Sequence, residues 1–215
     1  MLSLWPILFA YLLGAVPFGL LVARIFGIRD IRALGSGNIG ATNVWRIAGA
    51  KAAVWVYLLD IGKGVLAVLV AQMVPQEIMP RELFLTVSGL AAMLGHVFPV
   101  YLRFKGGKGV NTGLGVMISL LPLETVVALL VFVIVVALTR FISLGSILAA
   151  VILFATVLVE RLYLHREISL VYLYLSLATA AIVLWTHRPN LKRLANGTEN
   201  HFSLSSRAKG ATPHG

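Results

Sequence analysis

Residues 123–139 have the sequence LETVVALLVFVIVVALT, in which Glu124 is the only charged side chain. A helix needs about 20 consecutive apolar residues to cross the hydrocarbon core of a bilayer, so this block is close to a full span. Six further apolar blocks accompany it, at about residues 2–26, 50–74, 83–102, 109–121, 145–163 and 168–186. The sequence therefore predicts an all-α fold, a polytopic transmembrane bundle of about seven helices.

The composition supports a membrane protein with a single domain. Of the 215 residues, 59% are hydrophobic and 12% are charged, and the mean hydropathy is +0.93. Soluble domains have roughly half apolar and a quarter charged residues. Residues 1–202 are expected to form one integral membrane domain, and the small polar residues 203–215 a disordered tail. The first apolar block lacks the basic start of a signal peptide, which predicts a retained span.

The block at 109–121 is too short for a complete span at a rise of about 1.5 Å per residue. A glycine-rich stretch precedes it and Pro122 follows it. We expect one short helix here, either tilted or only half inserted. A five-span arrangement, in which neighbouring blocks merge around this segment, stays open.

The distribution of charge orients the bundle, because cytoplasmic loops of membrane proteins are enriched in Lys and Arg. The formal net charge is +10. If the N-terminus lies outside, the outer loops hold only Arg81, Arg161 and Arg166 beside five glutamates, and Lys63 lies within a span. The other cations then lie on the inner side, and an odd number of spans places the C-terminus in the cytoplasm. The sequence shows no free basic arm of the kind that binds nucleic acid, so nucleic-acid binding is not predicted.

Several kinds of site are excluded by residues that the chain lacks. It has no Cys, which rules out disulfides, thiolate metal ligands and a cysteine nucleophile. The inner loops offer only two carboxylates, Asp30 and Glu199, so we predict no metal site and no cofactor. No stretch follows the G-x-x-x-x-G-K-[ST] pattern of a Walker A loop, so nucleotide binding is not predicted.

The first polar motif, residues 34–46, has the sequence LGSGNIGATNVWR. Its three glycines allow positive φ and a close approach of the backbone to a ligand. Arg46 offers a planar fork of donors that suits phosphate, and a helix beginning near Asn38 would direct free N–H groups at an anion. The neutral hydrogen-bonding side chains are Ser36, Asn38, Thr42 and Asn43. The alternative is a capped turn before the second span, with Arg46 as a topological anchor.

The second polar motif, residues 95–113, has the sequence GHVFPVYLRFKGGKGVNTG. Its centre resembles a nest of backbone N–H groups around an oxyanion, with two cations and a following helix N-terminus. The residues of this glycine loop are Lys105, Gly106, Gly107, Lys108 and Gly109. The alternative is a flexible cationic loop among lipid headgroups. His96 either takes part in the site or only bonds a backbone carbonyl.

Two shorter motifs lie on the same predicted side. Residues 140–146, RFISLGS, offer Ser143, whose alternative role is a helix cap. Residues 187–199, HRPNLKRLANGTE, offer His187, Arg188 and Asn190, and Glu199 is available to pair with a cation of the inner side. The alternative for the last motif is a basic segment beside the membrane.

Asp60 and Lys63 form a pair of opposite charges inside the second span. They are three residues apart and therefore share one face of a helix. Charges in a span are costly and face the protein interior or a cavity. A structural ion pair is favoured here over a catalytic pair.

The four motifs together resemble the bacterial acyl-phosphate:glycerol-3-phosphate acyltransferases in order, spacing and span pattern, over residues 1–202. The resemblance implies a seven-helix membrane enzyme that transfers a fatty acyl group from a long-chain acyl phosphate to the sn-1 hydroxyl of glycerol 3-phosphate. The implied products are lysophosphatidic acid and inorganic phosphate, and membrane lipid surrounds the site. The implied partner is a soluble enzyme that makes the acyl phosphate.

The resemblance also implies residue roles. The glycine loop with Lys108 would hold a phosphate, Ser36 would orient the attacking hydroxyl, and Glu199 would be structural. The contacts to glycerol phosphate would come from Ser36, Arg46, Lys105, Ser143, His187 and Asn190.

No inner-loop carboxylate is placed to act as a general base, so the expected base is a substrate phosphate oxygen or a water molecule. Phosphate is a good leaving group, so positioning and electrostatic stabilisation can carry the reaction without a covalent intermediate. Two rival hypotheses are a transporter of a phosphate-bearing solute and a lipid phosphatase or phosphotransferase. Transporters often contain repeats, and none is visible here.

Overall fold

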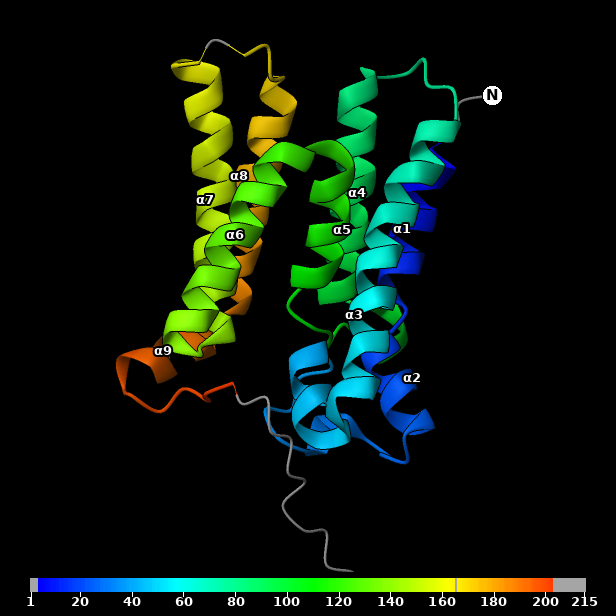
Figure 1. Ribbon diagram of the computed structural model, residues 1–215. Coiled ribbons are helices and arrows are strands. Elements are labelled where there is room, and N and C mark those ends of the chain that lie inside the picture. Colours follow the sequence, from blue (N-terminus) through cyan, green and yellow to red (C-terminus); the bar gives the residue numbers. More distant parts are fainter. Residues whose placement is uncertain (1–3, 165, 203–215) are drawn as a thin grey trace, which may run out of the picture.

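The computed structural model describes residues 4–164 and 166–202, and every regular element within them is a helix. Figure 1 shows the helices running roughly parallel in one bundle. The α-helices are α1 (Trp5–Ala15), α2 (Phe18–Ile25), α3 (Ala41–Met73), α4 (Arg81–Val97), α5 (Val110–Leu120), α6 (Pro122–Thr139), α7 (Ile142–Leu162), α8 (Leu170–Thr186) and α9 (Arg188–Ala195). The 3₁₀ turns are η1 (Ile31–Ala33) and η2 (Val100–Leu102).

The predicted membrane bundle is confirmed. Five helical segments are long and apolar enough to cross a bilayer, and α8 joins them if it is counted with α9, from which it bends by 59°. The short segment expected at 109–121 is α5, which has 11 residues. Residues 203–215, which were expected to form a disordered tail, lie outside the described part of the chain.

Three features differ from the predicted segments. The first apolar block is two helices, because Pro17 has no N–H to continue α1. The second block is preceded by an extra helical stretch, since α3 begins at Ala41 and is interrupted at Gly49, where φ is 83°. The basic segment after the last span is itself a helix, α9.

Glycine contacts hold the helices of one half of the bundle close together. A methyl group at Gly14 of α1 would collide with the backbone of Ala92 of α4. A methyl group at Gly115 of α5 would likewise collide with the carbonyl of Ile61 of α3. Helices in lipid gain no hydrophobic driving force from association, so close packing of small residues stabilises these pairs.

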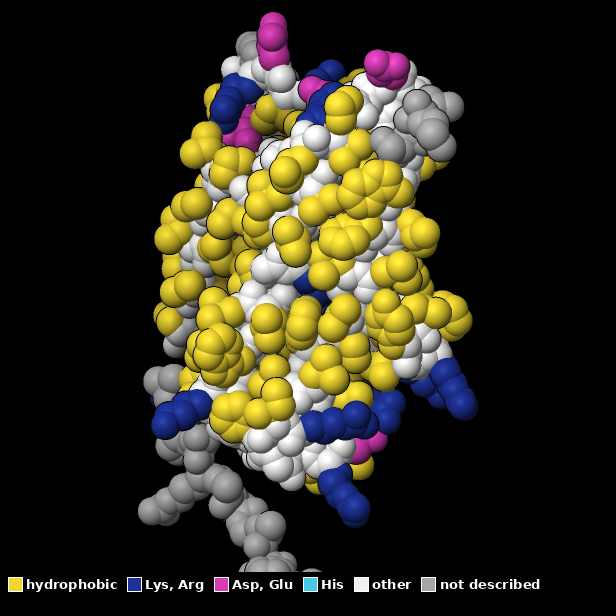
Figure 2. All heavy atoms as spheres, turned by 90° about the vertical axis from the view of Figure 1, so that its right-hand side faces the viewer, with side chains coloured by type: hydrophobic (Ala, Val, Ile, Leu, Met, Phe, Trp, Pro, Cys, Tyr) yellow, Lys and Arg dark blue, Asp and Glu magenta, His cyan; other side chains and the backbone are white. Residues whose placement is uncertain are grey.

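The remaining helices, α6, α7 and α8, form the second group in Figure 1. The outer face of α6 exposes large apolar side chains, including Leu130 (59%) and Leu138 (80%), which suits contact with lipid acyl chains. Figure 2 shows a belt of apolar side chains on the face that lies on the right in Figure 1, with charged side chains mostly near its two ends. Both faces therefore fit a bilayer.

Candidate active site

The four polar motifs meet at the end of the bundle where α9 lies, around a cavity of about 240 Å³. Each motif contributes to its wall, although the motifs come from distant parts of the sequence. The predicted site residues that line it are Ser36, Asn38, Thr42, Asn43, Arg46, Lys108, Gly109, Ser143, His187, Asn190, Glu199 and the buried Asp60. Four segments that share no sequence neighbours thus form one polar site.

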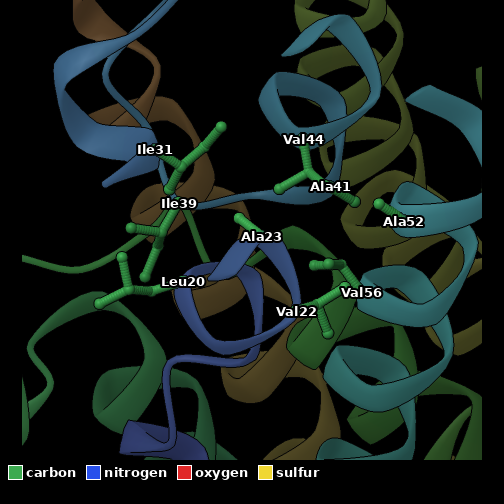
Figure 3. Close-up of a cluster of buried hydrophobic side chains, with 9 residues drawn as sticks. All are labelled: Leu20, Val22, Ala23, Ile31, Ile39, Ala41, Val44, Ala52 and Val56. Atoms are coloured by element: carbon green, nitrogen blue, oxygen red, sulfur yellow. The ribbon is translucent and has the colours of Figure 1, made fainter. Parts of the chain in front are cut away.

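An apolar cluster fixes the loop that carries Ser36. Ile31 and Ile39 at the two ends of this loop pack against side chains of α2 and α3, as Figure 3 shows. The loop between them is held by one amide: Asn43 donates to the carbonyls of Leu34 and Asn38 and accepts from the N–H of Ser36, at 3.0, 2.9 and 2.9 Å. Asn43 was expected to bind substrate, but its amide is engaged with the loop backbone.

Arg46 reaches the cavity from the first turns of α3. Its side chain is half-buried, and Thr42, one helical turn earlier, lines the same wall. Asn38 Oδ1 accepts a hydrogen bond of 2.8 Å from the N–H of Gly40, which shapes the turn just before the helix. A guanidinium held at the cavity wall in this way can bind a phosphate through two parallel hydrogen bonds.

The glycine loop, residues 105–109, brings Lys108 into the cavity. Gly109 adopts a φ of 79° at the N-terminus of α5, a conformation that favours glycine. Lys108 Nζ donates a hydrogen bond of 2.6 Å to Asn190 Oδ1. Burial is the main cause that lowers the pKa of Lys108 to about 8, and the nearby Arg193 and Arg46 act in the same direction. The amino group of Lys108 therefore loses its proton at a pH only slightly above neutral.

Four residues that were predicted to bind substrate do not line this cavity. Lys105 is exposed, and Gly106 and Gly107 lie behind Lys108 against the end of α4. Arg188 is exposed on α9, with its guanidinium 5.9 Å from the ring of Trp185. Their predicted roles in binding stay predictions.

Glu199 links the last motif to the third through hydrogen bonds. Its Oε1 accepts from Ser143 Oγ at 2.9 Å and from Asn190 Nδ2 at 2.7 Å, and its Oε2 pairs with Arg193 Nε at 2.7 Å. Burial alone would raise the pKa of Glu199, but these hydrogen bonds outweigh it and lower the pKa. Ser143 bonds this carboxylate and does not cap α7, whose N-cap residue is Phe141.

His187 lies buried at the junction of α8 and α9. Its Nδ1 is 2.8 Å from the carbonyl of Val183, so Nδ1 carries the proton and Nε2 is left as an acceptor. Burial and the charge of Lys108 lower the pKa of His187 to about 4. The imidazole is therefore neutral at physiological pH.

An apolar cavity of about 210 Å³ adjoins the polar one and extends between α3, α5, α6, α7 and α8. Tyr57, Asn111, Phe132 and Ser146 line both cavities and mark their junction. Asn111 and Ser146 lie within two of the polar motifs but were not predicted as site residues. Tyr57 and Phe132 lie within apolar blocks, where no local pattern distinguishes them from lipid-facing residues.

Comparison with known proteins confirms the resemblance seen in the motifs. Residues 4–197 match the glycerol-3-phosphate acyltransferase family. The glycerol-3-phosphate acyltransferase of Geotalea daltonii is 45% identical over 90% of this chain and 94% of its own, and that of Geobacter sulfurreducens is 46% identical over the same shares. A crystal structure of PlsY (YgiH), "an integral membrane glycerol 3-phosphate acyltransferase" in "the glycerol 3-phosphate form", matches with a TM-score of 0.83 at 38% identity, covering 93% of this chain and 95% of that one. With its membrane bundle and its four motifs around one polar cavity, this chain belongs to the glycerol-3-phosphate acyltransferase family.

Proposed function

We propose that the protein transfers a fatty acyl group from acyl phosphate to the sn-1 hydroxyl of glycerol 3-phosphate, giving lysophosphatidic acid and inorganic phosphate. The observation that carries this proposal is the junction of two cavities, one cationic and polar and the other apolar. The polar cavity suits the two phosphate groups of the substrates. The apolar cavity suits the acyl chain, so the acyl carbonyl would lie at the junction.

In the proposed reaction the sn-1 oxygen attacks the acyl carbonyl carbon, and the bond from that carbon to the phosphate oxygen breaks. The hydroxyl proton passes to a phosphate oxygen or to water. Arg46 and Lys108 would bind and neutralise the phosphates, and Lys105 would add charge from the same loop. Ser36 would orient the hydroxyl, and Ser143, His187 and Asn190 would complete the contacts to glycerol 3-phosphate.

Neither carboxylate that lines the cavity is free to act as a general base. Glu199 is engaged by three donors, and Asp60 is paired with Lys63 at 2.8 Å. The neutral His187 can accept a hydrogen bond at Nε2, but its pKa of about 4 makes it a weak base. This supports a base supplied by the substrate or by water.

The pH–rate profile of His187→Gln tests this assignment. We expect the variant to keep the shape of the wild-type profile between pH 6 and 9, because a group with a pKa of about 4 does not titrate in that range. Loss of a sharp pH dependence in the variant, with glycerol 3-phosphate binding intact, would instead make His187 the base.

We further propose that the site faces the cytoplasm, with the N-terminus outside, in a bacterial inner membrane. The basic loops around the site support this orientation through the positive-inside rule. The acyl phosphate would then come from a soluble cytoplasmic enzyme. Cysteine labelling of Ser36→Cys and Gln76→Cys in intact cells and in inverted vesicles tests this orientation, because these positions lie at opposite ends of the bundle.

The direct test of the proposed reaction uses purified protein in detergent with palmitoyl phosphate and glycerol 3-phosphate. We expect inorganic phosphate and lysophosphatidic acid in equal amounts, and no product with palmitoyl-CoA as the donor. Product from palmitoyl-CoA without product from palmitoyl phosphate would contradict the proposed donor.

Narrowing the apolar cavity is expected to change the preference for donors. Ala128 of α6 is buried at the cavity wall, so Ala128→Phe fills space that we assign to the acyl chain. We expect kcat/KM for palmitoyl phosphate to fall at least tenfold relative to a short-chain donor, because each methylene that no longer fits an apolar pocket changes discrimination by about 1–3 kcal/mol. The matched control is Leu130→Phe on the exposed face of the same helix, which should leave the ratio unchanged.

A further inference from the structure

A buried cluster of charged and polar side chains lies directly below the polar cavity. Lys63 Nζ is 2.8 Å from Asp60 Oδ1, and His96 Nδ1 is 3.6 Å from the same oxygen. Thr112 Oγ1 lies 3.2 Å from His96 Nδ1. The four residues come from α3, α4 and α5, and each is at most 6% exposed. Asp60 and His96 also line the floor of the cavity, so the cluster and the site are continuous.

One end of this cluster fixes the break between the first two helices. Lys63 Nζ donates a hydrogen bond of 3.1 Å to the carbonyl of Val16, immediately before Pro17. The ring of Phe18 lies 5.5 Å from the same amino group. The ammonium group thus stabilises a carbonyl at the helix break and balances the charge of Asp60, as buried charges require.

The other end of the cluster supports the glycine loop. The N–H of Gly107 donates 3.1 Å to the carbonyl of His96, and the N–H of Gly106 donates 3.2 Å to the carbonyl of Val97. A methyl group at Gly107 would collide with His96 Nε2, and one at Gly106 would collide with the His96 carbonyl. Both the backbone and the ring of His96 therefore form the surface on which the loop rests.

This geometry does not suit acid–base chemistry. The Nδ1 atom of His96 faces Asp60 and Thr112, while Nε2 lies against Gly107. Both ring nitrogens are therefore already in contact with groups of the protein. The contact of His96 Nδ1 with the Asp60 carboxylate instead fixes the orientation of the ring, as a carboxylate beside a metal-bound histidine does.

We propose that Asp60, Lys63 and His96 form a positioning cluster that fixes the glycine loop and thereby holds Lys108 at the phosphate position of the polar cavity. Lys108 follows Gly107 directly, and its Nζ is placed against Asn190 on the opposite wall. A shift of the His96 ring would move the loop and with it this cation. The inference rests on the proposed function, because it gives the cluster a task in that site.

The first test is His96→Ala, assayed with palmitoyl phosphate and glycerol 3-phosphate. Misplacement of a binding group by about 1 Å can lower a rate by about 100-fold. We expect the KM for a phosphate-bearing substrate to rise about 10- to 100-fold, with a smaller change in kcat. The matched control is Ser88→Ala on the same helix, a fully buried hydroxyl bonded to the carbonyl of Phe84, which should leave both constants within about twofold.

A double-mutant cycle separates positioning from general stability. If His96 acts through Lys108, adding His96→Ala to Lys108→Met should lower kcat/KM by less than about threefold, since the affected group is already absent. Losses that multiply fully in the double variant would overturn the proposal. If His96→Ala does not fold, Thr112→Val replaces it in the cycle, because it removes the hydroxyl beside the imidazole and leaves the charges paired.

Binding without the acyl donor keeps this inference distinct from the proposed reaction. Glycerol 3-phosphate should raise the Tm of the wild-type protein in detergent, and His96→Ala should lose most of that rise. If glycerol 3-phosphate raises the Tm of the wild type but palmitoyl phosphate releases no phosphate, only the proposed acyl donor is contradicted. A full rise and an unchanged KM in a folded His96→Ala variant would overturn the positioning cluster.

Discussion

Replacement of Arg46 by alanine is expected to lower kcat/KM for acyl transfer by about 100- to 1,000-fold, because loss of one partner of a buried charged contact costs about 2–5 kcal/mol. The guanidinium is half-buried at the cavity wall and carries a donor geometry that matches phosphate. Steady-state kinetics with both substrates measure the loss. The Tm should change little, since the side chain lies at a cavity and not in an apolar cluster.

Two variants sharpen this prediction. Arg46→Lys keeps the charge but loses the planar fork, so it should recover only part of the activity. Arg24→Ala removes an exposed arginine from α2, outside the cavity, and should leave kcat/KM nearly unchanged. Equal activity in Arg46→Ala and Arg24→Ala would show that Arg46 is only a topological anchor.

Affinity for glycerol 3-phosphate is expected to fall as the pH rises through about 8, the pKa of Lys108 in the protein without substrate. Below this pH the amino group is protonated and attracts the phosphate, and above it the positive charge is lost. If one essential proton is lost, kcat/KM falls by at most tenfold for each pH unit. Initial rates at low substrate concentration between pH 7 and 10 measure this limb.

The origin of the alkaline limb can be assigned with substitutions of the same residue. Lys108→Arg keeps its charge to higher pH, so the limb should move beyond the measured range. Lys108→Met removes the titrating group, so kcat/KM should be about 100-fold lower than in the wild type. It should also be independent of pH above 8. A limb that persists unchanged in Lys108→Arg would assign the titration to another group.

The sequence predicted the helices well because their apolar blocks report directly on contact with lipid. It predicted the interruptions of these helices poorly. Gly49 interrupts α3 at a left-handed φ. The carbonyl of Val16, before Pro17, accepts a hydrogen bond from Lys63, which is distant in the chain. Helix α9 was missed because a short amphipathic helix beside the membrane contains too few apolar residues to form a block.

The site was predictable where glycines and polar side chains gather in the predicted inner loops. Arg46, Lys108 and His187 were named from these motifs and from the family resemblance, and the structure places all three around one cavity. The function of an amide was not predictable in the same way, since Asn43 uses its hydrogen bonds to hold the loop. Nor could the sequence show that Asn111 borders both cavities, because that depends on where the fold places α5 relative to α6 and α7.

The pairing of Asp60 with Lys63 within a single helix has a consequence for the biosynthesis of the protein. On the scale of the insertion machinery, one unpaired Asp or Lys at the centre of a span adds about 2.5–3.5 kcal/mol to the free energy of insertion. The two residues are one helical turn apart, so they neutralise each other as soon as α3 forms. This helix can therefore enter the lipid before α4 has been synthesised, whereas charges divided between two helices would have to wait for each other.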